Sequence, residues 1–274
     1  MYPKRRNQYL CLGDSFSYVH GSARVKPFGF NTLQKKSVIS ASRTANLLGL
    51  GNKIREKYVQ EVADPQLCEN EVLDDFTRNA MYHGSNYEHD ASLMFLDRMR
   101  YSWKPIGNVE EQLTYTVKYV NVGQPKSKPF TIGATPDLLL YSPADQSRAL
   151  LEIKCPYRKW LDQSDIYDEE TAWSLLADKH YIQCQIQMLI TQIQKCFLFF
   201  YVPHRDGSPS FNSCTWKIDA DRPFQHFLLA QIEQAYQEVE KEERDKFALI
   251  RNEGAHNRVI THESKIQHVT FLLP

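Results

Sequence analysis

Glu152-Ile-Lys-Cys-Pro156, preceded by Gly133-Ala-Thr-Pro-Asp137, is the part of the sequence that most restricts the fold. Both segments lie in runs of apolar and β-branched residues, which predict short strands. Because successive side chains of a strand point to opposite faces, Glu152 and Lys154 share one face while Ile153 points into the core. Pairing of the two strands would therefore bring the carboxylate of Asp137 next to Glu152 and Lys154.

Two carboxylates and one ammonium group at one place are what metal-assisted hydrolysis of a phosphodiester requires. In such chemistry the carboxylates hold Mg²⁺ or Mn²⁺, the cation activates water and neutralises the phosphate, and lysine orients the attacking oxygen. By itself the arrangement of Asp137, Glu152 and Lys154 therefore predicts a nuclease.

The length and composition favour one α/β domain. With 274 residues and 42% hydrophobic side chains, the chain is long enough to bury a large core. We expect a basic amino-terminal arm over residues 1–34, the core over 35–220, and a carboxyl-terminal helix and tail over 221–274. No stretch is long and apolar enough to cross a membrane, and the amino terminus lacks the apolar run of a signal peptide. We therefore expect an intracellular protein without membrane contact.

Formal charge is distributed unevenly along the chain. The net charge is +0, but residues 1–57 hold 11 Lys and Arg against only two acidic residues, Asp14 and Glu56. Basic segments attract nucleic acid because they release the counterions of the phosphates. On charge alone, DNA contact and a solvated basic arm explain this segment equally well.

The cysteines give no sign of a metal site. Their spacing does not suit zinc and argues against an iron–sulfur cluster. In a reducing compartment we expect them to be free and mostly buried thiols. The six residues are Cys11, Cys68, Cys155, Cys184, Cys196 and Cys214.

Apolar periodicity predicts helices and strands on both sides of the motif. The second predicted helix has an apolar stripe that includes Phe76, Met81 and Phe95, and Gly84 is expected to bend it. Ser40 or Ser42 is expected to cap the first helix. The predicted helices cover residues 41–62, 70–99, 168–193 and 223–250. The predicted strands cover residues 112–122, 130–141, 149–154, 196–202, 213–218 and 268–273.

Three weaker signals lie outside the motif. Glu88 on the second predicted helix is, by itself, most simply a solvated carboxylate. Gln183 and Gln187 share one helix face, with Gln185 roughly opposite, and fit either polar surface or an amide that touches phosphate or water. Arg158, just after the motif, fits a DNA channel and a surface patch equally well.

Five blocks occur in one order along the chain: Ser40-Ala-Ser42, His83-Gly84-x-x-Tyr87-Glu88, Thr135-Pro-Asp137, Leu151-Glu-Ile-Lys-Cys-Pro156 and Gln183-x-Gln185. In this order they resemble the lambda exonuclease or YqaJ-like viral recombinase family, which belongs to the PD-(D/E)xK nuclease superfamily. The resemblance covers about residues 35–202. It implies a restriction-endonuclease-like core, with a central mixed β-sheet flanked by helices and helical elaborations at both ends.

The resemblance also implies a role for each residue of the motif. Asp137 and Glu152 would bind Mg²⁺ or Mn²⁺, with two ions in each site, and the carbonyl oxygen of Ile153 would complete one coordination shell. Lys154 would position the attacking water and help to deprotonate it. Glu88 would lie beside the metal ions as a further acidic group.

Other residues are implied to contact water or DNA. Gln183 would hold the attacking water or the scissile phosphate, and Arg158 would line the DNA channel. Lys35, Ser42 and Thr135 fall where the family binds the 5′-terminal phosphate of the strand that is degraded. Lys35 stands where the family has an arginine. A lysine ammonium is a point charge and cannot donate two parallel hydrogen bonds to a phosphate as a guanidinium does. This departure weakens the expectation that digestion depends on a 5′ phosphate.

The activity implied by the resemblance is Mg²⁺-dependent 5′→3′ exonuclease digestion of double-stranded DNA ends, which leaves a 3′ single strand for recombination. A ring-shaped homotrimer and a single-strand annealing partner are implied as well.

Leu138 stands where glycine is usual in the family. This departure should alter the turn but not the neighbouring carboxylate of Asp137.

Two alternatives to this activity are open. One is an endonuclease or an RNA-degrading nuclease on the same core, and the other is a DNA-binding recombination partner with a vestigial site. We expect the protein in the bacterial cytoplasm if it comes from a phage. If it comes from a eukaryotic virus, we expect it in the host nucleus or cytoplasm.

Overall fold

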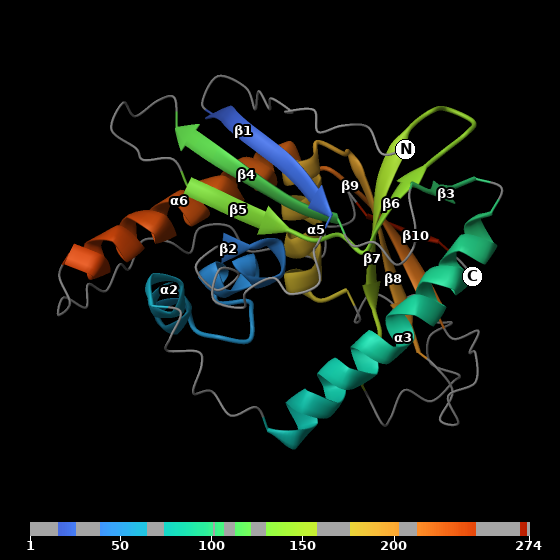
Figure 1. The fold of residues 1–274 in the computed structure, drawn as a ribbon, viewed down its shortest axis with the longest axis horizontal. Helices are drawn as coiled ribbons and strands as arrows, with labels where there is room; N and C mark the ends of the chain where they lie inside the picture. The colour runs from blue at the N-terminus through green and yellow to red at the C-terminus, as the bar shows by residue number, and fades with distance from the viewer. Residues whose placement is uncertain are drawn as a thin grey trace.

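The computed structural model describes residues 16–25, 39–64, 74–100, 102–106, 113–121, 130–157, 176–202, 213–244 and 269–272, with the backbone alone for 16–25, 113–121, 130–131, 240–244 and 269–272. In this part of the chain two β-sheets pack with five helices (Figure 1). None of these helices is both long and apolar enough to cross a membrane.

The larger sheet has six strands in the order β10-β9-β8-β7-β6-β3. β7 and β8 run parallel, and all other neighbouring pairs are antiparallel, so the expected mixed sheet is confirmed. Four of its strands, β7 to β10, match predicted strands to within one residue at each end, and β10 is the predicted edge strand. The strands are β3 (Lys104–Pro105), β6 (Leu138–Tyr141), β7 (Arg148–Lys154), β8 (Lys195–Tyr201), β9 (Ser213–Asp219) and β10 (Val269–Leu272).

The smaller sheet has the order β1-β4-β5-β2, with β1 (Phe16–Val25), β4 (Leu113–Asn121), β5 (Phe130–Ala134) and β2 (Ile39–Ser40). Residues 16–25, inside the expected basic amino-terminal arm, form the strand β1, which pairs with β4 with one irregularity between Tyr18 and His20. The Gly and Ser residues of this segment are not typical of a strand, but β4, which is distant in the sequence, supplies the backbone hydrogen bonds that make it one. Residues 122–129, between β4 and β5, lie outside the described part of the chain.

The predicted strand over residues 130–141 is in fact two strands in different sheets. It stops at Thr135-Pro-Asp137, between β5 of the smaller sheet and β6 of the larger one. Pro136 has no N–H to donate to a neighbouring strand, so a proline favours the end of regular pairing there. The chain crosses from one sheet to the other at the residues that precede Asp137.

The first predicted helix is divided into a 3₁₀ helix, η2 (Ala41–Leu48), and α2 (Arg55–Ala63). Gly49 ends η2 with a φ of 68°, a backbone conformation that glycine adopts without strain. Ser40 occupies the N-cap position, but its side chain makes no capping hydrogen bond. The glycines of this segment therefore stop the helix that the apolar pattern predicted.

α3 (Asp75–Met99) is continuous, so the bend predicted at Gly84 is wrong. A Cβ atom at Gly84 would meet nothing within 4 Å, and no described part of the chain packs closely there. Asp74 caps the helix, because its carboxylate accepts a hydrogen bond from the Thr77 N–H at 2.6 Å. Met81 and Phe76 are exposed, so the first half of the predicted apolar stripe is not buried.

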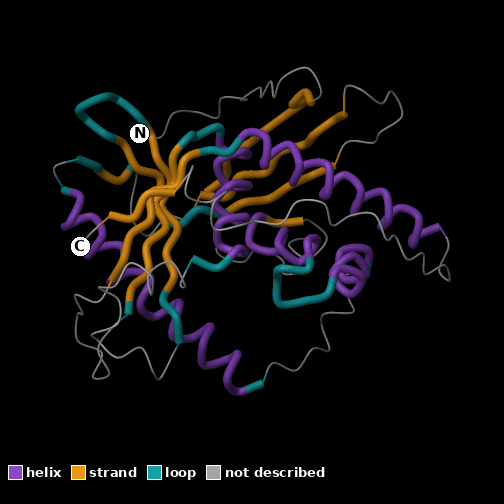
Figure 2. The backbone as a smooth tube through the Cα atoms, turned by 180° about the vertical axis from the view of Figure 1, so that it is seen from behind, coloured by secondary structure: helices purple, strands orange, loops and turns teal. Residues whose placement is uncertain are grey.

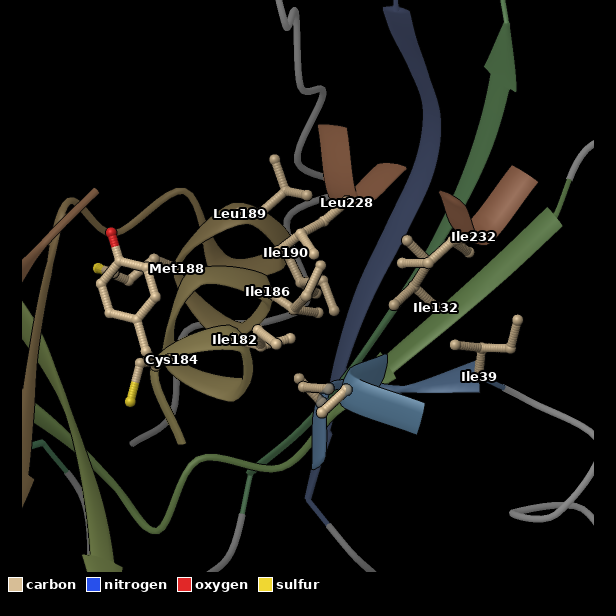
Figure 3. Close-up of a cluster of buried hydrophobic side chains, with 14 of the residues drawn as sticks. Ile39, Ile132, Ile182, Cys184, Ile186, Met188, Leu189, Ile190, Leu228 and Ile232 are labelled. Carbon is tan, nitrogen blue, oxygen red and sulfur yellow. The ribbon is translucent and has the colours of Figure 1, made fainter. Parts of the chain in front are cut away.

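α5 (Asp178–Thr191) lies between the two sheets, and α6 (Arg222–Arg244) packs behind it (Figure 1). In Figure 3, Cys184 and Met188 point to one side of α5, while Ile186 and Ile190 point toward β5 and α6. These side chains are all buried. A helix that is covered on both sides needs apolar residues around most of its circumference, which explains its poor amphipathic pattern.

The larger sheet is covered on both faces, with α5 on one side and α3 on the other (Figures 1 and 2). Along β8, Leu198 packs into the core beside α5, whereas Phe197 and Phe199 pack against Phe95 of α3. Fully burying one such side chain stabilises the fold by about 1.5–3 kcal/mol. The continuous apolar run of β8 follows from this burial on two faces.

Candidate active site

Asp137 lies just before β6 and is tied to β7 twice. Its backbone N–H donates to the carbonyl oxygen of Leu151 at 3.1 Å, and its Oδ2 accepts from the backbone N–H of Ile153 at 2.6 Å. The second bond fixes the orientation of the carboxyl group relative to β7. Strand pairing therefore places the Asp137 carboxylate beside the end of β7, as the sequence predicts.

Glu152 points from β7 toward α5, and its carboxylate is almost fully enclosed, with 3% of the residue exposed. Oε1 accepts from Lys154 Nζ at 2.5 Å and from Gln183 Nε2 at 2.6 Å, and Oε2 accepts from Gln187 Nε2 at 2.6 Å. A buried carboxylate needs such partners because leaving it unpaired would cost several kcal/mol. Glu152 and Lys154 share one face of β7, and Ile153 is buried on the other, as alternation requires.

Negative charge accumulates at this end of the sheet. Burial raises the pKa of Asp137 well above its usual range, and the charges of Glu152 and Glu88 raise it further. Burial alone would lower the pKa of Lys154, but the carboxylates of Glu152 and Asp137 outweigh it and raise this pKa. Lys154 therefore remains an ammonium group.

The donor set fits a hard divalent cation. Asp137 and Glu152 supply carboxylate oxygens, and a bound cation would offset both the burial and the neighbouring negative charges that raise the pKa of Asp137. No group of three or more His, Cys, Asp or Glu side chains in the described part of the chain is arranged to hold a metal on its own. Mg²⁺ suits such a site, because it commonly takes one or two carboxylates and fills its other positions with water and substrate phosphate.

Glu88 reaches this cluster from α3. It is half-buried, and its charge raises the pKa of both Asp137 and Cys155. Glu88 is therefore close enough to the cluster for its charge to act on it, which supports the role implied by the resemblance over that of a simple solvated carboxylate. Burial and these neighbouring charges raise the pKa of Cys155 to about 12, so the thiol stays protonated and is a poor nucleophile.

Ser42 and Thr135 lie at the same end of the smaller sheet. β2 pairs in parallel with β5, and Ser40 lies opposite Gly133, so the segments that continue from these residues leave the sheet side by side. Ser42 is exposed and Thr135 is half-buried. Thr135 is also two residues from Asp137 along the chain. Lys35 and Arg158 lie outside the described residues.

The three glutamines of α5 have different surroundings. Gln183 and Gln187 bind Glu152, whereas Gln185 is fully buried on another side of the helix. Gln185 Nε2 donates to the Asp219 carbonyl oxygen at 3.0 Å, and its Oε1 accepts from the Asp221 N–H at 2.9 Å. Spacing predicted the shared face of Gln183 and Gln187, but not that both amides point at one carboxylate. The sequence implied a specific role at the active site for Gln183 but none for Gln187.

The four cysteines in the described part of the chain are free thiols, and three of them are buried. The expectation of reduced, mostly buried cysteines is confirmed for these residues.

The structure also explains why leucine stands at position 138, where glycine is usual in the family. Leu138 is 5% exposed and fills the core between the larger sheet and α3. Its φ is negative, so the backbone at this position does not require glycine.

Three solved structures share this fold. An alkaline exonuclease from Laribacter hongkongensis superposes with a TM-score of 0.52 at 20% identity, over 78% of this chain and 93% of that one. The same enzyme in complex with dAMP gives a TM-score of 0.52 at 21% identity over the same shares of the two chains. A phage related exonuclease from Haemophilus somnus 129PT gives 0.52 at 12% identity, over 77% of this chain and 96% of that one. At these identities the likeness establishes the fold.

Sequence comparison establishes the family. No curated protein sequence matches this chain. The YqaJ-like viral recombinase domain matches residues 31–194, which is more than half of the chain and includes the whole cluster around Glu152. The resemblance inferred from the five sequence blocks is therefore confirmed, and the chain belongs to the family of YqaJ-like viral recombinase domains.

Proposed function

We propose that this protein is a divalent-cation-dependent deoxyribonuclease that digests double-stranded DNA from its 5′ ends and leaves 3′ single strands for recombination. The observation that carries the proposal is the convergence of Asp137, Glu152 and Lys154 at one end of β7. Family membership and the exonuclease fold of the structural relatives support it.

In this proposal Asp137 and Glu152 would hold Mg²⁺ or Mn²⁺, and the carbonyl oxygen of Ile153 would be a further ligand. When bound, the cation supplies Lewis acidity and neutralises charge on the scissile phosphate. Glu88 adds to the negative potential that attracts the cation. The number of ions, which we predict to be two, and the choice between Mg²⁺ and Mn²⁺ stay predictions.

Lys154 and Gln183 act beside these ligands. Lys154, held as an ammonium against Glu152, orients the attacking water by donating a hydrogen bond to it. An ammonium group has no lone pair to accept a proton, so Lys154 would help to deprotonate the water only through its positive charge, and this stays a prediction. Gln183 donates to Glu152 in the structure, so we propose that it first orients this carboxylate and that it contacts water or phosphate when DNA is bound.

The 5′ end is recognised, in this proposal, by the hydroxyl groups of Ser42 and Thr135. Two observations support this role: β2 and β5, which these residues follow, end side by side, and Thr135 is two residues from Asp137. Hydroxyl groups and a nearby cation can together bind a terminal phosphate. Lys35 as a phosphate ligand, Arg158 in a DNA channel, a homotrimer and an annealing partner stay predictions.

The test uses one linear duplex labelled at the 5′ or the 3′ end, with and without a 5′ phosphate, in the presence of Mg²⁺. We expect early release of the 5′ label, faster digestion of the phosphorylated end, and no cleavage of covalently closed circular DNA. Asp137→Ala should be inactive. Early release of the 3′ label would overturn the direction, equal rates on both 5′ ends would dismiss the phosphate role of Ser42 and Thr135, and full activity of Asp137→Ala would overturn the assignment of the site.

A further inference from the structure

α5 brings two glutamine amides to the two oxygens of a single carboxylate. Gln183 Nε2 lies 2.6 Å from Glu152 Oε1, and Gln187 Nε2 lies 2.6 Å from Glu152 Oε2. Residues four positions apart lie on the same face of a helix, so one face of α5 presents both donors. Rotation of the Glu152 carboxylate would break at least one of these bonds, and the pair therefore holds it in one orientation.

Gln187 occupies a position where an apolar side chain would pack with less cost. Gln187 itself is 0% exposed, and its neighbours on α5, Ile186 and Met188, are apolar and fully buried. Among the described residues, its amide oxygen has no hydrogen-bond partner. A buried unsatisfied carbonyl oxygen is destabilising, so packing alone does not account for an amide at this position. Its bond to Glu152 Oε2 does account for it.

We infer that Gln187 is a positioning residue for the reaction: its amide fixes the second oxygen of Glu152 and so sets the orientation in which this carboxylate binds the cation. The inference rests on the proposed function of Glu152 as a metal ligand. Gln187 acts through Glu152, and nothing requires it to touch DNA. Groups that hold a metal ligand in place typically account for about 10–100-fold in metal affinity or activity.

The test compares the wild-type protein with Gln187→Met, which keeps the length and volume of the side chain but removes the donor. The concentration of Mg²⁺ that gives half-maximal cleavage of a 5′-phosphorylated duplex should rise about 10–100-fold, and kcat at a fixed low Mg²⁺ concentration should fall by a similar factor. KM for the duplex should stay within about twofold, because Gln187 acts on the ligand and not on DNA. Without DNA, the rise in unfolding temperature produced by MnCl₂ should shrink.

Gln185→Met is the matched control, because Gln185 is on the same helix, is equally buried, and bonds to Asp219, Asp221 and Gln225 and not to Glu152. It should lower the unfolding temperature while kcat and the half-saturating Mg²⁺ concentration stay within about twofold of the wild type. If Gln187→Met does not fold, Gln187→Asn, whose shorter amide no longer reaches Glu152, is measured in the same way.

The two proposals fail in different ways. If a folded Gln187 variant keeps the wild-type kcat and half-saturating Mg²⁺ concentration and loses only thermal stability, Gln187 is purely structural and the inference is wrong. If the wild-type protein shows neither cation-dependent cleavage nor stabilisation by MnCl₂, the proposed function is wrong, and the inference falls with it.

Discussion

Lys154 differs from an ordinary surface lysine because the carboxylate of Glu152 holds it in place and the charge of Asp137 adds to the attraction. Its Nζ lies 2.5 Å from Glu152 Oε1, and its side chain is 25% exposed, so it is both oriented and accessible to a substrate. A rigidly held ammonium can orient a water molecule with little further loss of entropy. Removing it also leaves Glu152 with only neutral donors.

Lys154→Met is expected to lower the rate of DNA cleavage by about 10²–10⁴-fold, the usual effect of losing a group that orients or transfers a proton. Single-turnover cleavage of a phosphorylated duplex in saturating Mg²⁺ measures this loss. Circular dichroism shows whether the variant keeps its fold. A variant that folds and cleaves at the wild-type rate would contradict the role of Lys154.

Asp145, in the turn between β6 and β7, gives a pH dependence that is unrelated to the site. Hydrogen bonds from Ser142 and Ser147 lower the pKa of Asp145 from 3.8 to about 2. Because the folded pKa lies below the unfolded one, the stabilisation is fully present above about pH 4 and is lost as the pH falls through 2. The difference in unfolding temperature between the wild type and Asp145→Asn should therefore shrink from pH 5 to pH 2. A difference that is constant over this range would contradict the shift.

At the scale of elements, α3 has two halves with different surroundings. Phe76 is 66% exposed near its start, whereas Phe95 is fully buried against Phe197 and Phe199. The apolar pattern is similar in both halves, but the larger sheet covers only the second one. The two phenylalanines therefore make a matched pair.

Phe95→Ala is expected to lower the free energy of unfolding by about 3–5 kcal/mol, because it removes a fully buried ring. Phe76→Ala is expected to change it by no more than about 0.5 kcal/mol, as for most exposed positions. Urea denaturation of both variants provides the measurement. A Phe76 variant as unstable as the Phe95 variant would show that the first half of α3 is covered after all.

The end of α5 contains a strained residue. Gln192 follows the helix with a φ of 60°, in the left-handed region that side chains other than glycine adopt at a cost. Gln192→Gly is expected to raise the free energy of unfolding by up to about 1 kcal/mol, since the relief of strain exceeds the entropy that glycine adds to the unfolded chain. Thermal unfolding measures the effect, and a lower unfolding temperature would contradict it.

At the scale of the whole molecule, α5 connects the two sheets. One side of it packs on β7 and β8 of the larger sheet, and the other packs on β5 and α6 (Figure 3). Ile186 lies in the second contact and is 0% exposed. We therefore predict that the two sheets unfold together, as one domain.

Ile186→Ala is expected to cost about 2–5 kcal/mol, as is usual when a buried isoleucine is truncated. The loss should shift the whole unfolding curve, so circular dichroism and tryptophan fluorescence should report the same midpoint in urea. Leu93→Ala on the exposed side of α3 serves as the control and should leave the midpoint nearly unchanged. Two separate transitions would show that the sheets unfold independently.

Much of the larger sheet was predictable because its strands are short segments rich in apolar, aromatic and β-branched residues. β7, β8 and β9 lie within one residue of the predicted ranges. The division of residues 130–141 was not predictable in the same way, since both parts have strand composition and only their partners differ. The exposure of Phe76 and Met81 was not predicted for a related reason. Apolar periodicity shows which residues share a face of a helix, but not whether another part of the chain covers that face.

The common face of Glu152 and Lys154 can be derived from the sequence alone, because alternation along a strand is local geometry that no distant contact alters. Membership of the family followed from short blocks of the same local kind. The surroundings of Glu152, in contrast, depend on how α5 packs in the folded molecule. The crossover from β7 through α5 to the parallel strand β8 lays this helix over the sheet, and core packing sets its rotation. That packing brings Gln183 and Gln187 into contact with Glu152, although more than 30 residues separate them along the sequence. Patterns of neighbouring residues do not predict contacts between segments so far apart in the sequence.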